Sequence, residues 1–121
     1  MTLEESLVNN LKTIVKIYPL NAEKSLDVDY ATIETISDDD DKSLNGYSGL
    51  TTETKEIDII CKKYSSLKIL YKQVKDKLKS LEKSTLGEYF IQEIAFEESS
   101  PELWEDEINK YRKIITFSIS Y

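Results

Sequence analysis

The sequence contains no histidine, and this absence removes the commonest routes to catalysis. Neither a Ser-His nor a Cys-His nucleophile can form without one, and the most frequent general base is missing. A structural zinc site needs several cysteine or histidine ligands, whereas the chain has the single cysteine Cys61. The three glycines, Gly46, Gly49 and Gly87, lack the spacing of a phosphate-cradling loop. We therefore expect no enzymatic activity and no cofactor.

Other scarce features narrow the class of protein further. One cysteine allows no internal disulfide, and Cys61 alternates with Ile57 and Ile59, so we expect it to be a small buried hydrophobe. No apolar run approaches the ~18–20 residues that cross a bilayer. The first residues have neither the basic nor the apolar region of a signal peptide. We expect no membrane association.

The net charge is −7 over 121 residues, which we interpret as one domain covering residues 1–121. A protein that grips DNA through its phosphates needs a basic face, and this composition argues against one. It does not exclude a protein that surrounds DNA without holding it, because like-charged walls repel phosphates.

Two amphipathic helices are predicted from apolar residues at three- and four-residue spacing. Thr2 and Glu5 have the spacing of a capping box for the first helix, and Pro19 ends it. Ser65 or Ser66 can cap the second helix. The apolar positions are Leu3, Leu7, Leu11, Ile14, Val15 and Tyr18 in the first helix, and Leu67, Leu70, Tyr71, Val74, Leu78 and Leu81 in the second.

Four strands are predicted, over about 28–36, 51–63, 88–97 and 108–121. The last is the clearest, since Tyr111, Ile115, Phe117, Ile119 and Tyr121 alternate with polar residues, broken by Lys113. Gly87 marks the turn before the third strand. The order α-β-β-α-β-β predicts an α+β fold: a four-stranded, mainly antiparallel sheet with both helices packed on one face.

Residues 37–50 are expected to form a long mobile acidic loop between the first two strands. Asp38 to Asp41 are adjacent and repel one another, and Gly46 and Gly49 favour turns. The aspartate spacing does not match an EF-hand, so we interpret the run as solvated and expect no metal site.

Charge is also sorted along the sequence. Residues 27–58 include ten acidic residues and two lysines, and residues 62–83 include eight lysines and two acidic residues. Residues 88–107 include eight acidic residues and no basic one. The lysines of the second helix either form an ordinary solvated face or contact an acidic segment of a neighbouring copy. Unlike faces allow head-to-tail contacts, which form rings when they close.

Trp104 lies in the acidic segment between the last two predicted strands, and two interpretations are open. It is either a loop residue that closes one end of the core or an anchor in an interface, where tryptophan is enriched.

The order of elements resembles a phage family, the tail terminator or tail-to-head joining (tail completion) proteins of long-tailed siphophages. The resemblance covers nearly the whole chain and lies in these segments: Ile17-Tyr-Pro-Leu20, Val28-Asp-Tyr30, the Gly/Tyr-containing loop, Ile57-Asp-Ile59, Tyr64-Ser-Ser-Leu-Lys68 and Tyr111-Arg-Lys-Ile-Ile-Thr-Phe117.

The resemblance implies a structural protein that forms a hexameric ring, caps the finished tail tube and stops its polymerisation. The implied partners are other copies of the chain, the tail tube protein and the head-completion or connector protein, with DNA passing through the ring unbound. The implied location is the virion, at the head–tail interface, and the host cytoplasm during assembly. In the family, the segment matching residues 37–50 tends to be mobile in free subunits and to take part in the ring.

Two other functions stay open from the residues alone. One is an acidic interaction protein, such as an antitoxin, immunity protein or inhibitor that occupies a basic partner. The other is an enzyme that uses only carboxylates. The candidate interface residues are Asp38, Asp39, Asp40, Asp41, Gly46, Tyr47, Lys68, Lys72, Lys75, Lys79 and Trp104.

Overall fold

The structure is a computed structural model that describes residues 2–19, 29–43, 46–97, 101–106 and 109–121. Side chains are described for these residues except 19 and 38–50. The helices are α1 (Leu3–Leu11) and α2 (Tyr64–Ser80). The strands are β1 (Lys16–Pro19), β2 (Tyr30–Ser43), β3 (Gly46–Cys61), β4 (Thr85–Leu86), β5 (Tyr89–Phe90), β6 (Glu93–Phe96), β7 (Leu103–Glu105) and β8 (Lys110–Ser120).

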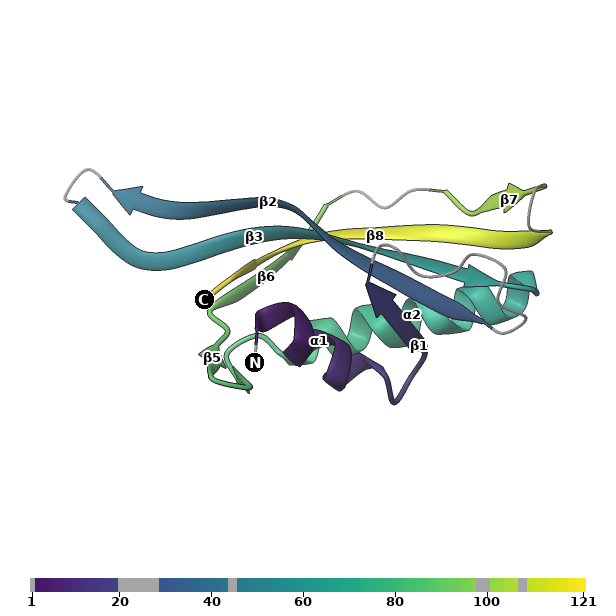
Figure 1. Cartoon of the computed structure of the whole chain (residues 1–121), viewed down its shortest axis with the longest axis horizontal. Coiled ribbons are helices and arrows are strands. Elements are labelled where there is room, and N and C mark those ends of the chain that lie inside the picture. Colours follow the sequence, from purple (N-terminus) through teal and green to yellow (C-terminus); the bar gives the residue numbers. More distant parts are fainter. Residues whose placement is uncertain (1, 20–28, 44–45, 98–100, 107–108) are drawn as a thin grey trace.

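The molecule has a sheet layer and a helix layer. In the described part of the chain, the main sheet has six strands in the order β1-β2-β3-β8-β6, with β7 on the same edge of β8 as β6. Only the β1–β2 pair is parallel. Both helices lie against one face of this sheet (Figure 1). The predicted α+β class, with a mainly antiparallel sheet and two helices on one face, is therefore confirmed, but the predicted number of four strands is wrong.

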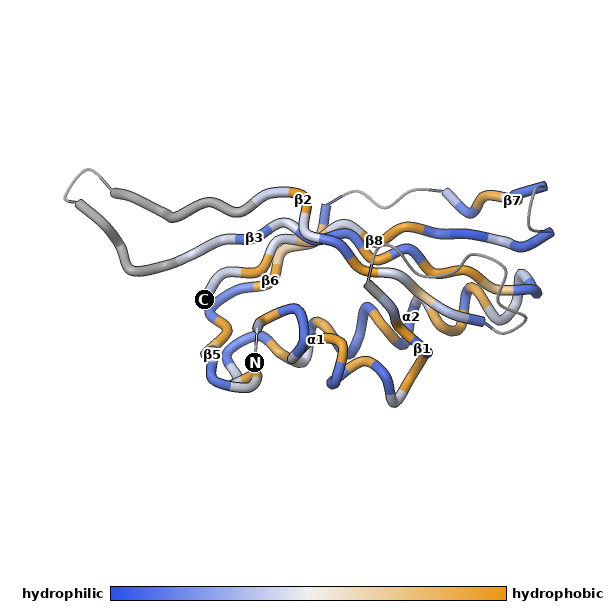
Figure 2. The backbone as a smooth tube through the Cα atoms, viewed as in Figure 1, coloured by the Kyte–Doolittle hydropathy of each residue, from blue (hydrophilic) through white to orange (hydrophobic). Residues whose placement is uncertain are grey.

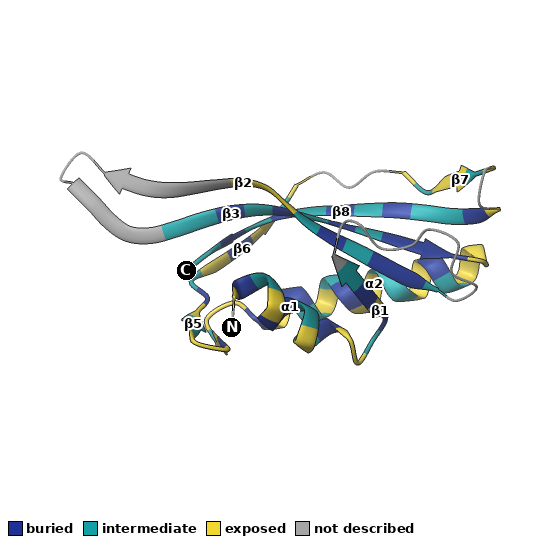
Figure 3. Ribbon diagram, in the orientation of Figure 1, coloured by how far each residue is buried: buried dark blue, intermediate teal, exposed yellow. Residues whose placement is uncertain are grey.

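The core lies between the helices and the covered sheet face. Helix α1 contributes Leu3, Leu7 and Leu11, which recur once per turn, and α2 contributes Leu67, Val74 and Leu78. They meet alternate residues of the strands, such as Ile115, Phe117 and Ile119 of β8, and Figure 2 shows apolar and polar residues mixed along these strands. Each large apolar side chain fully buried there contributes about 1.5–3 kcal/mol. The strand residues facing the helices are mainly buried and their neighbours are partly exposed (Figure 3).

The C-terminal strand confirms the prediction from alternation. Ile115, Phe117 and Ile119 are buried in the core, and Lys113 lies in the same phase with its side chain also largely buried. The Lys113 nitrogen lies 4.6 Å from the centre of the Tyr71 ring on α2. The lysine therefore keeps the inward phase by placing its charge against an aromatic face.

The first predicted helix is too long. Its capping box is present, because Thr2 and Glu5 bond each other's backbone N–H, but α1 ends at Leu11 and Lys12 caps it. After a short turn, β1 pairs with β2 from Lys16 to Pro19. Val15 and Ile17, at alternate positions, are buried. Apolar residues beyond Leu11 fit both periods, and parallel pairing with β2 decided for the strand.

The predicted loop over residues 37–50 is also wrong. Strand β2 continues to Ser43 and β3 begins at Gly46, so the segment is a β-hairpin, with residues 44–45 outside the described residues. Cross-strand backbone hydrogen bonds then outweigh the repulsion that predicted a loop.

Two smaller boundaries differ from the prediction. The third predicted strand, 88–97, is split into β5, which pairs with β4 in a separate two-stranded sheet, and β6, which joins the main sheet. Helix α2 begins one residue before the predicted serine caps, after Lys63, which makes no side-chain capping bond.

Gly87 forms the turn between β4 and β5, as predicted. Its φ is +62°, and an added Cβ would lie 2.5 Å from the Ser6 hydroxyl of α1. This turn therefore packs directly against the first helix.

Candidate interaction surfaces

The β2–β3 pair continues past the helices as a hairpin, which we call the arm (residues 38–43 and 46–50; Figure 1). Strand β8 follows β3 only as far as Thr51, whose backbone exchanges hydrogen bonds of 2.8 and 2.9 Å with Tyr121. Strand β1 leaves β2 at Ile33. Across the described ranges, the arm therefore pairs with no third strand.

Several predicted interface residues fall on the arm. Asp38, Asp39 and Asp40 pair with Glu53, Thr52 and Thr51, while Gly46 and Tyr47 open β3 opposite Ser43 and Lys42. Asp41 lies at a shift in register between Asp40 and Lys42. The structure thus places all six predicted residues of this group on one hairpin.

A second register shift marks the base of the arm. Thr35 pairs with Lys55 and Ser37 with Thr54, so Ile36 is the extra residue of a bulge, and it is 52% exposed. Bulges bend a strand, and both bulges and charges discourage pairing with foreign strands. The direction of the arm is therefore set near Ile36.

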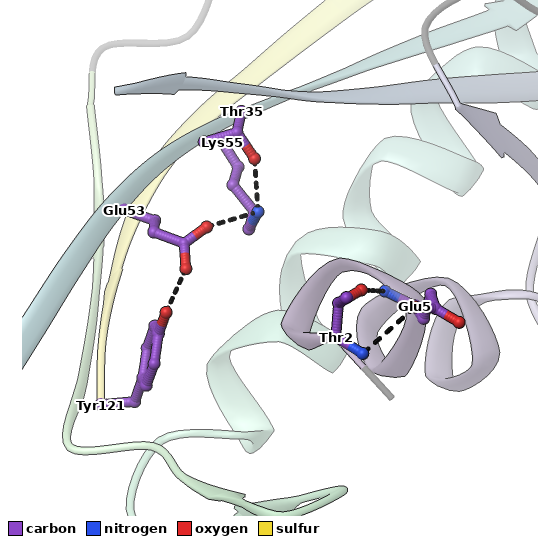
Figure 4. A network of polar contacts seen from close by, with 6 residues as sticks. All are labelled: Thr2, Glu5, Thr35, Glu53, Lys55 and Tyr121. Atoms are coloured by element: carbon purple, nitrogen blue, oxygen red, sulfur yellow. Dashed lines mark hydrogen bonds and ion pairs between the residues drawn. The ribbon is translucent and has the colours of Figure 1, made fainter. Parts of the chain in front are cut away.

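A buried polar network lies beside this bulge on the helix-covered face (Figure 4). Lys55, 1% exposed, places its Nζ 3.0 Å from Glu53 Oε1 and donates a 2.7 Å hydrogen bond to Thr35 Oγ1. The hydroxyl of Tyr121 donates to the other Glu53 oxygen. The network joins β2, β3 and β8 where the arm begins.

Our sequence prediction did not identify this network. Glu53 and Lys55 alternate with the same spacing as the buried residues Ile57 and Ile59. Two charged residues at positions where the alternation predicts burial could have indicated a buried ion pair. A buried ion pair of this kind is costly to break, because the remaining charge is left without a partner.

The opposite end of the long axis carries exposed aromatic and apolar side chains. The Trp104 and Tyr111 rings meet edge-on at 4.8 Å, and Tyr64 meets Tyr111 at 5.6 Å. Trp104 lies on edge strand β7, is 47% exposed, and donates from Nε1 to Asp106 Oδ1 at 2.6 Å. It is therefore neither in a loop nor buried in the core. Tyr64 is exposed on the same side, and Leu103, also exposed, precedes Trp104 in β7 and lies in the opposite phase.

The predicted lysines form one stripe along α2, at positions i, i+4, i+7 and i+11. Lys75 lies 5.1 Å from the Phe96 ring centre and Lys79 lies 5.9 Å from it, so both cover strand β6. Lys68 lies over the Tyr64 ring at 5.2 Å and 3.9 Å from Glu102. Lys72 is exposed.

Glu102 is an acidic residue that meets the lysine stripe within the same chain. Its carboxylate lies 3.9 Å from Lys68 Nζ and 3.8 Å from Lys113 Nζ. We expected the lysines of α2 to contact acidic residues of a neighbouring copy. One such contact, with Glu102 just before β7, is instead made within the chain.

The sheet face opposite the helices carries many charged residues, although Tyr30 and Ile60 are buried on it. Glu34 and Glu56 are paired across β2 and β3, and Asp58 lies 2.7 Å from Arg112, which also donates to Glu105 at 3.2 Å. Burial raises the pKa of the Asp58 carboxyl, and Arg112 opposes that rise. No helix in the described part of the chain covers this face (Figure 1).

Neither the thiol nor the carboxylates assemble into an evident reactive centre. Cys61 is buried in the core as predicted, and burial raises the pKa of its thiol to about 12, which keeps it protonated. Within the described ranges, no three Cys, Asp or Glu side chains gather as metal ligands. A search of the same residues finds no helix with the length and apolar character of a membrane span.

Comparison with known proteins shows the fold. No family model matches the sequence, and no curated protein matches it. Among solved structures, the chain is similar to one from the "Virion of native gene transfer agent (GTA) particle". The TM-score is 0.66 at 15% sequence identity, and the match covers 94% of this chain and 82% of that chain. The two chains therefore share an architecture over nearly their full lengths.

Proposed function

We propose that this protein is a structural component of a phage-like virion. The observation that carries the proposal is the shared architecture with a chain of the gene transfer agent particle, over 94% of this chain. A similarity confined to the sheet would have left the helices and the short strands unmatched. At 15% identity the argument concerns shape, so the role depends on which surfaces this chain presents.

Within that class, we propose the more specific role that the sequence resemblance implies. Copies form a ring, six in the family, that caps the tail tube, ends its polymerisation and joins the tail to the head connector. The chain contributes contact surfaces to this role and no catalysis. An acidic arm at one end and exposed aromatic and lysine side chains at the other suit head-to-tail contacts, which close into rings.

The acidic composition is compatible with a DNA passage. In the proposed ring, each copy brings a net charge of −7 to the wall of the opening. Repulsion between carboxylates and phosphates acts over a Debye length, about 8–10 Å in ordinary salt, and keeps DNA from adhering to the wall.

The direct test is to assemble tails with and without this protein and to image them by negative-stain microscopy. We expect tubes of irregular length that fail to attach to heads when the protein is absent, and recovery when the purified protein is added back. Tubes of normal length with normal head attachment would contradict the proposal. A tight one-to-one complex with a basic partner, and no protein in purified virions, would favour the acidic inhibitor class instead.

A further inference from the structure

We propose that the arm of one copy docks on the aromatic–lysine end of the next copy. We define this end by its exposed side chains on the helix side of the sheet: Lys63, Tyr64, Lys68, Lys72 and Trp104. The inference rests on the proposed ring and names the two surfaces that meet in it.

The two surfaces lie at opposite ends of the molecule. Figure 1 shows the arm at one end of the long axis, with β7 and the start of α2 at the other. A chain cannot dock its own arm at that distance, whereas a neighbour can. The contact is heterologous, so every copy offers one arm and receives another, and repetition gives a ring or a filament.

The arm by itself is expected to be only weakly stable, so a contact with a partner would stabilise it. An isolated two-stranded hairpin is at best marginally stable in water. The arm pairs with no third strand across the described residues, and Lys42 is its only basic residue against Asp38 to Asp41. A partner that neutralises the aspartates and covers part of the hairpin would stabilise it.

The receiving end has matching chemistry. Tyr64 and Trp104 are 43% and 47% exposed, and both rings meet Tyr111 edge-on, so two large aromatic side chains are exposed side by side. Aromatic residues of this kind carry much of the binding energy in protein interfaces. Lys63 precedes Tyr64 in the chain, Lys72 lies one turn beyond Lys68 on α2, and both are exposed.

Two acidic residues of this end are paired within the chain, since Glu105 contacts Arg112 and Glu102 is shared by Lys68 and Lys113. Asp106 keeps its negative charge, because the Trp104 N–H that it accepts is neutral. Lys63 and Lys72 have no partner of this kind among the described residues. They remain available to the aspartates of an incoming arm.

Trp104 provides the measurement, because it is the only tryptophan in the chain. Docking would move its ring from water to a protein contact, so its emission should shift to the blue as the concentration of the full-length protein rises. The same samples can be followed by light scattering. A Trp104 emission that stays constant up to about 1 mM would overturn the proposal, since contacts useful in assembly are stronger than that.

Charge reversal then identifies the surfaces. We expect Lys63→Glu with Lys72→Glu to raise the midpoint concentration of the shift at least about tenfold, since each change replaces an attraction with a repulsion. The matched control is Lys77→Glu with Lys83→Glu, which makes the same charge change at and just beyond the far end of α2 and should leave the midpoint within about twofold.

A mixing experiment separates this contact from general charge effects. Asp39→Lys with Asp40→Lys places lysines on the arm, and this variant alone should associate as weakly as the Lys63→Glu, Lys72→Glu variant. An equimolar mixture of the two should recover the Trp104 shift, because the reversed arm faces a reversed end. Failure of the mixture to recover would overturn the docking of these surfaces.

The outcomes for docking and for virion function are independent. Protein found in virions but without a Trp104 response would refute the docking and leave the proposed function standing. A Trp104 response that obeys the charge swap, in a protein absent from purified virions, would leave the docking standing and refute the function.

Discussion

The two halves of the β2–β3 pair differ although they belong to the same two strands. From Tyr30 to Ile33 and from Ile57 to Cys61, the pair lies over the helices and its inward side chains are buried. Beyond Ile36 the same strands leave the helices and continue as the arm. The first half is held by a core and the second by its own backbone ladder.

This difference indicates which half of the strand pair stabilises the fold and which half is exposed for contact with other proteins. A sheet half that buries apolar residues on α1 and α2 supports the fold by the hydrophobic effect, which is the dominant favourable contribution to folding. A half that extends beyond the helices has no such core to pack on, so we expect it to contribute little to folding. Between them, Lys55, Glu53, Thr35 and Tyr121 fix the arm to the sheet.

The largest effect is expected in the core half. Phe117→Ala should lower the free energy of unfolding by about 3–5 kcal/mol, because it empties the site of a fully buried ring that packs on Phe96. Urea denaturation followed by circular dichroism measures it. Phe90→Ala, at a 48% exposed site, is the matched control and should cost less than about 1 kcal/mol. Equal losses at both sites would show that the core is misplaced.

The second largest effect on the free energy of unfolding is expected at the buried polar network of Lys55, Glu53, Thr35 and Tyr121. Lys55→Ala leaves the largely buried Glu53 without its cation, and breaking such a pair costs about 3 kcal/mol. Replacing both charges, as in Lys55→Met with Glu53→Leu, should recover most of that loss in the same denaturation assay. If the double variant is as unstable as Lys55→Ala, the ion pair is not the source of the effect.

Shortening the arm should affect contact more than stability. Replacing residues 41–50 with Asn-Gly keeps the Asp40–Thr51 pair and closes it with a two-residue turn suited to hairpins. We expect the free energy of unfolding to change by less than about 1 kcal/mol, because loop-closure entropy varies slowly with length. Self-association should weaken at least about tenfold. A large loss of stability would show that the arm packs on the core.

The smallest effect is a pH dependence on the uncovered face. Burial raises the pKa of Asp58 in the folded state, so the folded protein binds its proton more tightly than the unfolded chain. The contribution of Asp58 to stability is therefore full below the ordinary aspartate pKa and is lost as the pH rises through the raised value. Asp58→Asn should remove this decline when unfolding is measured from pH 3 to 7. An unchanged pH profile would contradict it.

The fold class could be predicted because local patterns record it. The capping box of Thr2 and Glu5, the apolar stripe of α2 and the alternation of β8 each depend on residues a few positions apart. The predicted alternation of β8 is confirmed from Lys113 to Ser120, where buried and partly exposed residues alternate, whereas at the start of the strand Lys110 is buried and Tyr111 is only partly buried.

The interaction surfaces were only partly predictable. Trp104 and the lysines stand out by residue type, yet the sequence did not show that Lys75 and Lys79 cover Phe96 or that Glu102 holds Lys68. Such contacts join elements distant in the chain, and neither spacing nor composition reports them.

By itself, the sequence determined the two-layer α+β architecture, the inward faces of α2 and β8, and the separation of charge, because periodicity and composition are local properties. Only the tertiary structure decided that residues 16–19 form a strand, that the aspartates extend a hairpin, and that Lys55 lies buried beside Glu53. The physical reason is that strand pairing and buried ion pairs are long-range: a segment takes the conformation that its partner strand can hydrogen-bond, whatever its own residues favour.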